Sequence, residues 1–256
     1  MMRRWRVPIG MLVTALLLTA PTWAAKKPHD SGQGHFPAAK GNTWVYEGTV
    51  RENFQGDPPI SCTVELRRTI TDQRSLGEGA YLVSVHQTAR MIGDCLDAEE
   101  KVAMFESDLL WFMDGVRFRG RKVYEFSRNG VLEGTGHHDL RAVTAAEMRE
   151  YARQCPPDFI LPVAIWQRYP NDPNPLRKDG WDQWVASKGK PVKIGEEIRQ
   201  DVVTLRYRTG PDDTEVDFIP GVGVARMKYQ HKGTIDEWEL RLVRYHLTSP
   251  QPSPSR

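Results

Sequence analysis

Residues 201–243 alternate polar and apolar side chains, and this alternation constrains the fold more than any other part of the sequence. Its period of two residues is that of a β-strand, whose successive side chains point to opposite faces. Turn-forming residues interrupt the alternation at 210–213, at Pro220-Gly221 and at Lys232-Gly233. The segment therefore predicts four antiparallel strands with one apolar face and one charged face.

The positions of these turns also predict which residues face one another on neighbouring strands. The pairs expected on the apolar face are Leu205–Phe218, Tyr207–Val216, Val216–Ala225, Met227–Trp238 and Ala225–Leu240. The pairs expected on the charged face are Arg206–Asp217, Arg208–Glu215, Glu215–Arg226, Arg226–Glu239 and Lys228–Glu237. Each pair of opposite charges contributes about 0.2 to 1 kcal/mol. A slip of one residue would turn every charge toward the core, so the pattern specifies which face is buried.

The stretch "DFIPGVGVARMKY" (217–229) raises the alternative of a phosphate-binding loop, because two of its glycines lie two residues apart. Such a loop needs a helix N-terminus after its glycines, where backbone N–H groups and the helix dipole meet the anion. Here a strand pattern follows Gly223, and a third glycine is missing. Pro220 and Gly221 suit a type II turn, because proline fixes φ and glycine accepts a positive φ. We therefore predict a hairpin turn and not a nucleotide site.

Period-two patterns also occupy the first half of the chain. The residues expected on one face are Trp44, Tyr46 and Val50 in one strand, and Tyr81, Val83 and Val85 in another. Residues 101–107 are interpreted as a further short strand. Residues 144–153 predict a helix, because Thr144 and Glu147 form a capping box and prolines follow at 156–157. The expected fold is mainly β, a curved antiparallel sheet or partly open barrel with one helix near 144–153.

Residues 1–24 have the layout of a secretory signal peptide, with three arginines, a short apolar run and small residues before a cleavage site. After it we expect a flexible leader at 25–36, a single β-rich domain at 37–247, which two related halves could make up, and a disordered tail at 248–256. No cysteine lies near the cleavage site, so lipid anchoring there is not expected. No other stretch is apolar enough to span a membrane. We expect a periplasmic or secreted protein that is not an integral membrane protein.

The charge of the chain gives no support for a nucleic-acid partner. The formal net charge is +2, but removal of the signal peptide takes three of the 35 basic residues and none of the 33 acidic ones, which leaves about −1. Basic and aromatic residues mix at 116–128, yet they alternate there as in a half-buried strand. We therefore predict no binding of nucleic acid.

Three cysteines remain after export: Cys62, Cys95 and Cys155. In an oxidising compartment two of them are expected to form a disulfide, which leaves the third as a free thiol. Cys62–Cys95 is the favoured pair because both residues lie in the first β-rich half. Pairings of Cys155 with Cys62 or with Cys95 stay open.

The most suggestive cluster for binding is "WQRYPNDPNPLRKDGWDQW" (166–184). Its aromatic residues, Trp166, Tyr169, Trp181 and Trp184, surround a loop rich in Pro, Asn and Asp and could stack on sugar rings or on a peptide. The alternative is that they cover one end of the sheet, as large side chains commonly do.

Other motifs favour no particular chemistry. Gly136-His137-His138-Asp139 could begin a zinc site, but nothing nearby supplies a third ligand, so an exposed loop is the preferred interpretation. Hydrolase, metalloprotease and P-loop signatures are missing from the sequence. We predict no metal and no cofactor, name no catalytic residue, and favour a non-catalytic protein.

Two segments resemble exported bacterial β-rich proteins of unknown function: "FPAAKGNTWVYEG" near the predicted mature start and "VDFIPGVGVARMKY" with "WELRLVRYH" near the end. Those proteins share a Gly-Asn-x-Trp-x-Tyr start and a late Pro-Gly-Val-Gly hairpin. The resemblance covers about a quarter of the chain. It implies a curved antiparallel sheet similar to the lipoprotein-carrier folds of the bacterial envelope, which hold acyl chains in a hydrophobic concavity. It transfers no ligand residue to this chain.

Three functional hypotheses follow. The first is a non-catalytic exported protein that binds an apolar or amphipathic, lipid-like ligand, or an envelope protein, in the concavity of its sheet. The second is a glycan- or peptide-binding module that uses the aromatic residues of 166–184. The third is an unrecognised hydrolase.

Overall fold

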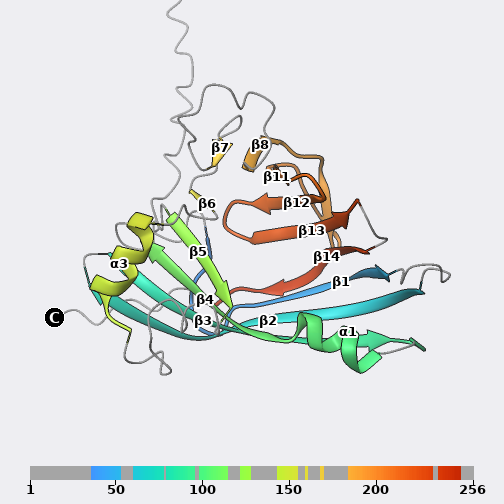
Figure 1. Ribbon diagram of the computed structural model, residues 1–256, viewed down its shortest axis with the longest axis horizontal. Coiled ribbons are helices and arrows are strands. Elements are labelled where there is room, and N and C mark those ends of the chain that lie inside the picture. Colours follow the sequence, from blue (N-terminus) through green and yellow to red (C-terminus); the bar gives the residue numbers. More distant parts are fainter. Residues whose placement is uncertain are drawn as a thin grey trace, which may run out of the picture. The chain divides into compact units, whose positions relative to one another are not determined.

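The computed structural model describes residues 36–52, 60–77, 79–95, 98–114, 122–127, 143–154, 159–160, 168–169, 184–232 and 236–248. Most of them form one large antiparallel sheet, which confirms the predicted mainly β fold (Figure 1). The expected signal peptide lies outside the described residues, as do the leader except Phe36 and the tail except Thr248.

The sheet has twelve strands in the order β6-β5-β4-β3-β2-β1-β14-β13-β12-β11-β8-β7. Their bounds are β1 Thr43–Glu52, β2 Ile60–Gly77, β3 Ala80–Ile92, β4 Ser107–Asp114, β5 Lys122–Ser127, β6 Phe159–Ile160, β7 Arg168–Tyr169, β8 Trp184–Lys188, β11 Val203–Arg208, β12 Asp212–Ile219, β13 Gly223–His231 and β14 Asp236–His246. A separate hairpin consists of β9 (Val192–Ile194) and β10 (Glu197–Arg199). The two edge strands, β6 and β7, do not pair with each other, so the sheet is not closed into a barrel.

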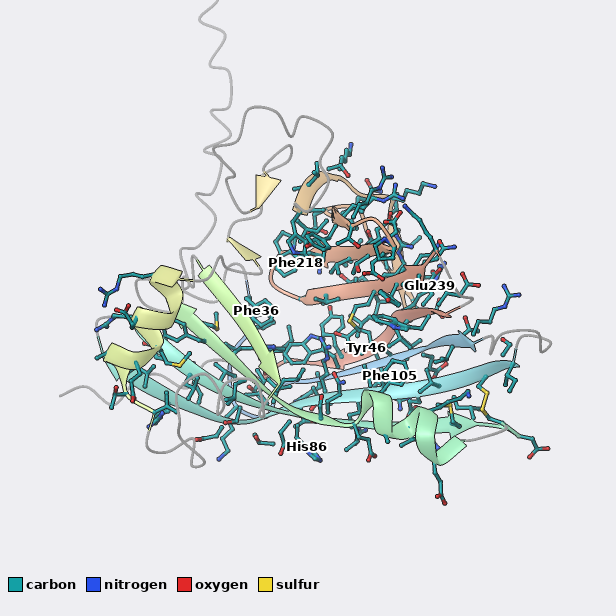
Figure 2. All side chains as sticks on the ribbon, viewed as in Figure 1. Phe36, Tyr46, His86, Phe105, Phe218 and Glu239 are labelled. Carbon is teal, nitrogen blue, oxygen red and sulfur yellow. A yellow bond between two sulfur atoms is a disulfide. The ribbon has the colours of Figure 1, made fainter. Side chains whose placement is uncertain are left out.

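The sheet is strongly curved around an apolar cluster on one side, which we call the inner face. The ring of Phe36 lies 4.8 Å from that of Trp111 in β4 and 6.2 Å from that of Phe218 in β12. These strands are six positions apart in the sheet, and six spacings of about 4.8 Å would separate them by about 29 Å if the sheet were flat. Figure 2 shows Phe36, Tyr46 and Phe218 on the inner side and His86 on the other. The expected curvature is therefore present.

The inner face is filled by large side chains. Those of Trp44, Tyr46 and Val50 are each at most 2% exposed, and Val83 and Val85 join the same cluster with Tyr81 at its margin, as the alternation predicted. Burial of such side chains contributes about 1.5 to 3 kcal/mol each. The inner face is the main core of the protein.

The predicted helix is confirmed as α3 (Ala145–Gln154). The backbone N–H of Glu147 donates to Thr144 Oγ1 (3.2 Å), and the backbone N–H of Thr144 donates to Glu147 Oε2 (2.8 Å). This capping box satisfies two donors at the start of the helix. Met148 of α3 packs against the outer face of β3 and β4, where Leu82 and Phe112 are buried.

A second helix, α1 (Ala98–Phe105), was not predicted, and the interpretation of residues 101–107 as a strand is wrong. Helices this short are marginal in water on their own, so their sequence carries a weak signal. Tertiary contacts stabilise α1 instead. The ring of Phe105 lies 6.0 Å from that of Trp238 in β14, and Gln87 Nε2 donates to the Phe105 carbonyl (2.5 Å). Among the described helices, none is both long and apolar enough to cross a membrane.

The register of the C-terminal strands differs by two residues from the expectation. Phe218 pairs with Val203 and not Leu205, and Met227 pairs with Leu240 and not Trp238. The first turn begins at Thr209, one residue before the expected position, with its N–H bonded to the Asp212 carbonyl (2.9 Å). A shift of two residues keeps side chains on their predicted faces, so the apolar and charged faces are confirmed although the partners are not. The exception is the bulge between Asp217 and Phe218, beyond which Ile219 and Val224 are buried in the main core.

The Pro220-Gly221 turn is confirmed, and no helix follows it. The N–H of Val222 donates to the Ile219 carbonyl (3.0 Å), and Gly221 has a φ of 76°. Trp44 Nε1 donates to the Val222 carbonyl (2.7 Å), so a side chain of β1 holds the turn in place. The turn at Lys232-Gly233 extends beyond the described residues.

Backbones approach closely where β1 pairs with β14. Gly48 lies opposite Leu240, and a Cβ placed on Gly48 would be 1.8 Å from the carbonyl oxygen of Glu239. Glycine is therefore required at this position in the middle of the sheet.

Candidate functional site

The charged face of β11–β14 carries a network of ion pairs centred on Arg226. Its Nε lies 2.6 Å from Asp217 Oδ2, its Nη2 contacts Glu215, and its Nη1 lies 3.8 Å from Glu239. Asp217 is buried and also accepts a hydrogen bond from Thr204 Oγ1 (2.5 Å). The predicted contacts of Arg226 with Glu215 and Glu239 are therefore present, although these residues lie diagonally and not directly opposite.

Other carboxylates of the described residues are also held by basic partners. A hydrogen bond from Arg206 lowers the pKa of Asp213, and one from Arg199 lowers the pKa of Asp201. A hydrogen bond from Arg90 likewise lowers the pKa of Glu65. Each shift favours the ionised carboxylate, as in a structural ion pair.

We expect Arg226→Ala to lower the free energy of unfolding by about 2 kcal/mol, because it leaves the buried Asp217 carboxylate with Thr204 as its remaining described partner. Arg241→Ala is the matched control. It removes the same charge, but the Arg241 side chain is 69% exposed, so we expect a loss below about 1 kcal/mol. Urea unfolding at neutral pH measures both. Equal losses in the two variants would contradict the central role of Arg226.

A pocket of about 540 Å³ opens between this charged face and the segment 188–193. Its lining residues are Ser187, Lys188, Lys190, Pro191, Val192, Lys193, Thr204, Glu215, Asp217, Ala225, Arg226 and Arg241. The strands β8 and β11–β14 supply the floor, and the chain around β9 supplies the wall. The lining therefore combines five basic residues, two acidic residues and a small apolar part.

The wall of the pocket is attached firmly to the sheet. The N–H of Gly189 donates to the Val202 carbonyl (2.8 Å), and a Cβ on Gly189 would lie 2.6 Å from the Val202 side chain. Ile194 of β9 is buried in the main core, and Tyr245 of β14 donates its hydroxyl to Glu197 of β10 (3.0 Å). These contacts fix the backbone that carries the three lysines.

The aromatic residues expected to bind a glycan are described only in part. Trp166 and Trp181 lie outside the described residues. Tyr169 in β7 is the strand partner of Trp184 in β8, so the fold brings the backbones of these two residues side by side. The Trp184 ring is half-buried, 5.3 Å from the ring of Tyr207. Their role in binding stays a prediction.

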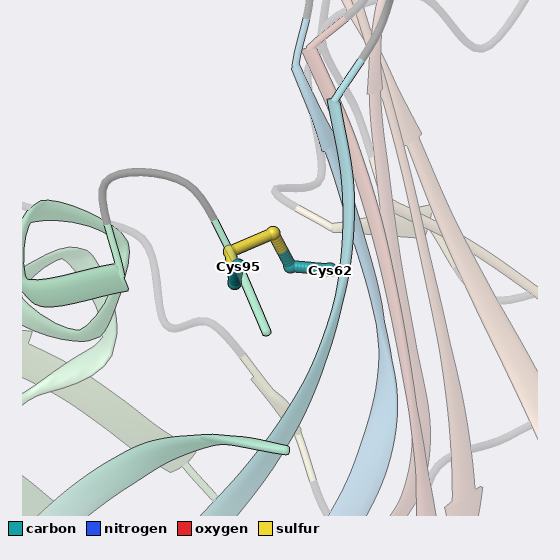
Figure 3. The surroundings of a disulfide bond; sticks show 2 residues. All are labelled: Cys62 and Cys95. Atoms are coloured by element: carbon teal, nitrogen blue, oxygen red, sulfur yellow. A yellow bond between two sulfur atoms is a disulfide. The ribbon is translucent and has the colours of Figure 1, made fainter. Parts of the chain in front are cut away.

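The structure contains a disulfide between Cys62 and Cys95, the pairing favoured from the sequence, with a Cα–Cα distance of 5.6 Å (Figure 3). It joins β2 to the segment that leads into α1. Cys155 and the motif Gly136-His137-His138-Asp139 lie outside the described residues. Within the described ranges, no group of three or more His, Cys, Asp or Glu side chains is placed to hold a metal ion.

Sequence reasoning did not find the pocket. The visible signal was "KGKPVK" (188–193), in which three lysines fall within six residues without an acidic residue between them. Periodicity describes which face of a strand is polar, but it does not show that a neighbouring hairpin folds over that face. The pocket depends on that tertiary contact.

No protein-family model and no curated protein matches the sequence. One similar solved structure is a Bacteroides fragilis protein described as exported with a YmcC-like fold; it is 7% identical, with a TM-score of 0.38 over 83% of this chain and 99% of that chain. Another is a Vibrio parahaemolyticus domain described as that of an outer membrane lipoprotein-sorting protein; it is 10% identical, with a TM-score of 0.23 over 84% of this chain and 88% of that chain. This chain is thus similar, at low sequence identity, to an exported protein and to an outer membrane lipoprotein-sorting domain.

Proposed function

We propose that this chain is an exported, non-catalytic protein that binds a small amphipathic ligand in the pocket beneath segment 188–193. The pocket itself carries this proposal. Its volume of about 540 Å³ lies within the range of about 300 to 1,000 Å³ that is usual for small-molecule sites. Its lining places the half-buried, apolar Val192 next to charged groups, which suits a ligand with both characters.

The pocket on the charged face is a better candidate than the inner face. Phe36, Trp111 and Phe218 fill the described part of the inner face with their own rings. A ligand there would have to displace well-packed core residues, at a cost of several kcal/mol.

The pattern of ionisation supports a binding role over a catalytic one. General acids and bases need a pKa near the working pH. The described carboxyls with a shifted pKa, such as Asp213 beside Arg206, have a lowered pKa because of basic or hydrogen-bonding partners. This shift moves their pKa further from neutral pH. Such groups hold the sheet together and position charges.

Two observations support export to the periplasm or beyond the cell. Residues 1–24 have the features of a secretory signal peptide. The Cys62–Cys95 disulfide is of a kind that persists in oxidising compartments.

Native mass spectrometry of the protein purified from a cell envelope fraction tests this function. We expect a fraction of the protein to carry a bound small molecule. Ser187→Tyr, which fills the pocket, should abolish the adduct, while Ser61→Tyr on an exposed position of β2 should retain it. A spectrum of the bare protein from every preparation would count against the proposal.

A glycan- or peptide-binding module remains the second candidate, because Tyr169 and Trp184 are strand partners and the Trp184 ring is partly exposed. An adduct with the mass of an oligosaccharide or peptide, unchanged in Ser187→Tyr and lost in Trp184→Ala, would favour this candidate over the pocket.

A further inference from the structure

The pocket has an excess of positive charge along one wall. Lys188, Lys190 and Lys193 all come from six consecutive residues and line the same cavity. Within the described part of the chain, neither Lys188 nor Lys190 has a carboxylate within 4.0 Å. Lys193 Nζ lies 3.8 Å from Glu196, whose side chain is 99% exposed, so that pair is weak.

The arginines of the same pocket are occupied. Arg226 is bound by Asp217 and Glu215, and Arg241 Nη2 lies 2.6 Å from Glu239. The floor is therefore close to neutral, and the uncompensated charge belongs to the three lysines. All three lysines are exposed, so an anion that enters the pocket can be reached by their side chains.

The lysines are carried by a backbone with little freedom. Gly189 is hydrogen bonded to Val202 and packed against its side chain, Pro191 has a fixed φ, and Ile194 is buried in the core. Because this backbone is already ordered, binding of an anion has to order only the lysine side chains and not the chain. The fold thus fixes the backbone from which three lysines reach one cavity.

We propose that the pocket binds its ligand through a phosphate monoester group, held by Lys188, Lys190 and Lys193. This inference rests on the ligand-binding function proposed above and names its chemical class. Three ammonium groups act as point charges and match the three terminal oxygens of a phosphate monoester. A carboxylate would instead favour the fork of an arginine, and Arg226 and Arg241 are already bound to carboxylates of the protein.

Isothermal titration calorimetry at low ionic strength tests the class of ligand. The probes are inorganic phosphate, glycerol 3-phosphate and dihexanoyl phosphatidic acid, with glycerol and dihexanoyl phosphatidylcholine as counterparts that lack the monoester. We expect saturable binding of at least one monoester or of phosphate, and none of the counterparts. Tighter binding of the phosphatidic acid than of glycerol 3-phosphate identifies a lipid source, and equal binding identifies a free phosphate compound. Equal binding of phosphatidic acid and phosphatidylcholine would overturn the inference.

Two triple variants distinguish phosphate binding at the pocket from a general effect of the protein's positive charge. Lys188→Gln, Lys190→Gln and Lys193→Gln together should weaken phosphate binding by at least about ten-fold, because the three charge-assisted hydrogen bonds are lost. Lys40→Gln, Lys228→Gln and Lys232→Gln together remove the same charge from residues outside the lining of the pocket and should change binding by less than about two-fold. If both triple variants weaken phosphate binding equally, the attraction is non-specific and the proposed phosphate site is wrong.

The two proposals fail differently. If an envelope-derived ligand is found by native mass spectrometry and the Lys188, Lys190 and Lys193 triple retains it, the binding function stands and the phosphate assignment is wrong. If no envelope ligand is found while phosphate binds and requires the lysines, the assignment stands and the amphipathic ligand is wrong.

Discussion

Replacing Cys62 by Ser is expected to lower the free energy of unfolding by about 3 to 4 kcal/mol. The disulfide closes a loop between residues 33 positions apart, and a cross-link of that span restricts the unfolded chain by about this amount. It also ties the start of α1 to β2, and α1 is too short to be stable alone. Urea unfolding measures the loss, and circular dichroism should report a small loss of helix from α1.

Cys155→Ser is the control for this prediction, because it removes the third cysteine and leaves the pair intact. Its free energy of unfolding serves as the reference for the loss caused by breaking the pair. Adding a reductant to Cys155→Ser should reproduce the loss seen in Cys62→Ser, and adding it to Cys62→Ser should change nothing further. A reductant without effect on Cys155→Ser would show that the cross-link does not stabilise the fold.

Gly48→Ala should destabilise the protein by about 3 kcal/mol or more, the second of the two largest effects. The added methyl carbon would lie 1.8 Å from the Glu239 carbonyl oxygen and 2.9 Å from the Leu240 Cα. Both atoms belong to the backbone of β14 and cannot rotate away, so the strands must separate or shift. The contact is in the middle of the sheet, where β1 also pairs with β2. Thermal and urea unfolding measure the effect.

Gly210→Ala provides the matched comparison. No heavy atom lies within 4 Å of the position that its Cβ would take in the turn between β11 and β12. We expect a change within about 1 kcal/mol of zero. If Gly48→Ala unfolds at the same urea concentration as Gly210→Ala, β14 does not approach β1 as closely as described.

The C-terminal strands show what period-two reasoning can and cannot determine. It placed Met227 and Phe218 inside and Arg226 outside, because a side chain's face depends only on the parity of its position. It missed the partners by two residues, because these depend on the position of the turn and on a bulge between Asp217 and Phe218. Thr209 takes part in the first turn through its hydroxyl, which accepts from the Asp212 N–H (3.0 Å), and the turn therefore begins one residue earlier than expected.

The elements that were missed depend on contacts distant in the sequence. Helix α1 is stabilised where Phe105 meets Trp238, from the opposite end of the chain. The pocket exists because Gly189 and Ile194 attach a hairpin over strands that come later. By contrast, α3 was found from the sequence because its capping box is made by two residues three positions apart, Thr144 and Glu147. Local chemistry could be predicted, and contacts between distant segments could not.

The pairing of β1 with β14 has a consequence for how the chain reaches its native state. Thr43 pairs with His246, and Asn42 accepts a hydrogen bond from the N–H of Thr248 (2.7 Å). The middle of the sheet is therefore formed by the first and the last of its strands in sequence. Contacts of such long range form slowly, because a large loop must close before they are gained. During synthesis from the N-terminus, β1 can pair early with β2, but its other edge has no partner until β14 has emerged. The two halves of the large sheet can therefore join only late in folding, when β14 meets β1.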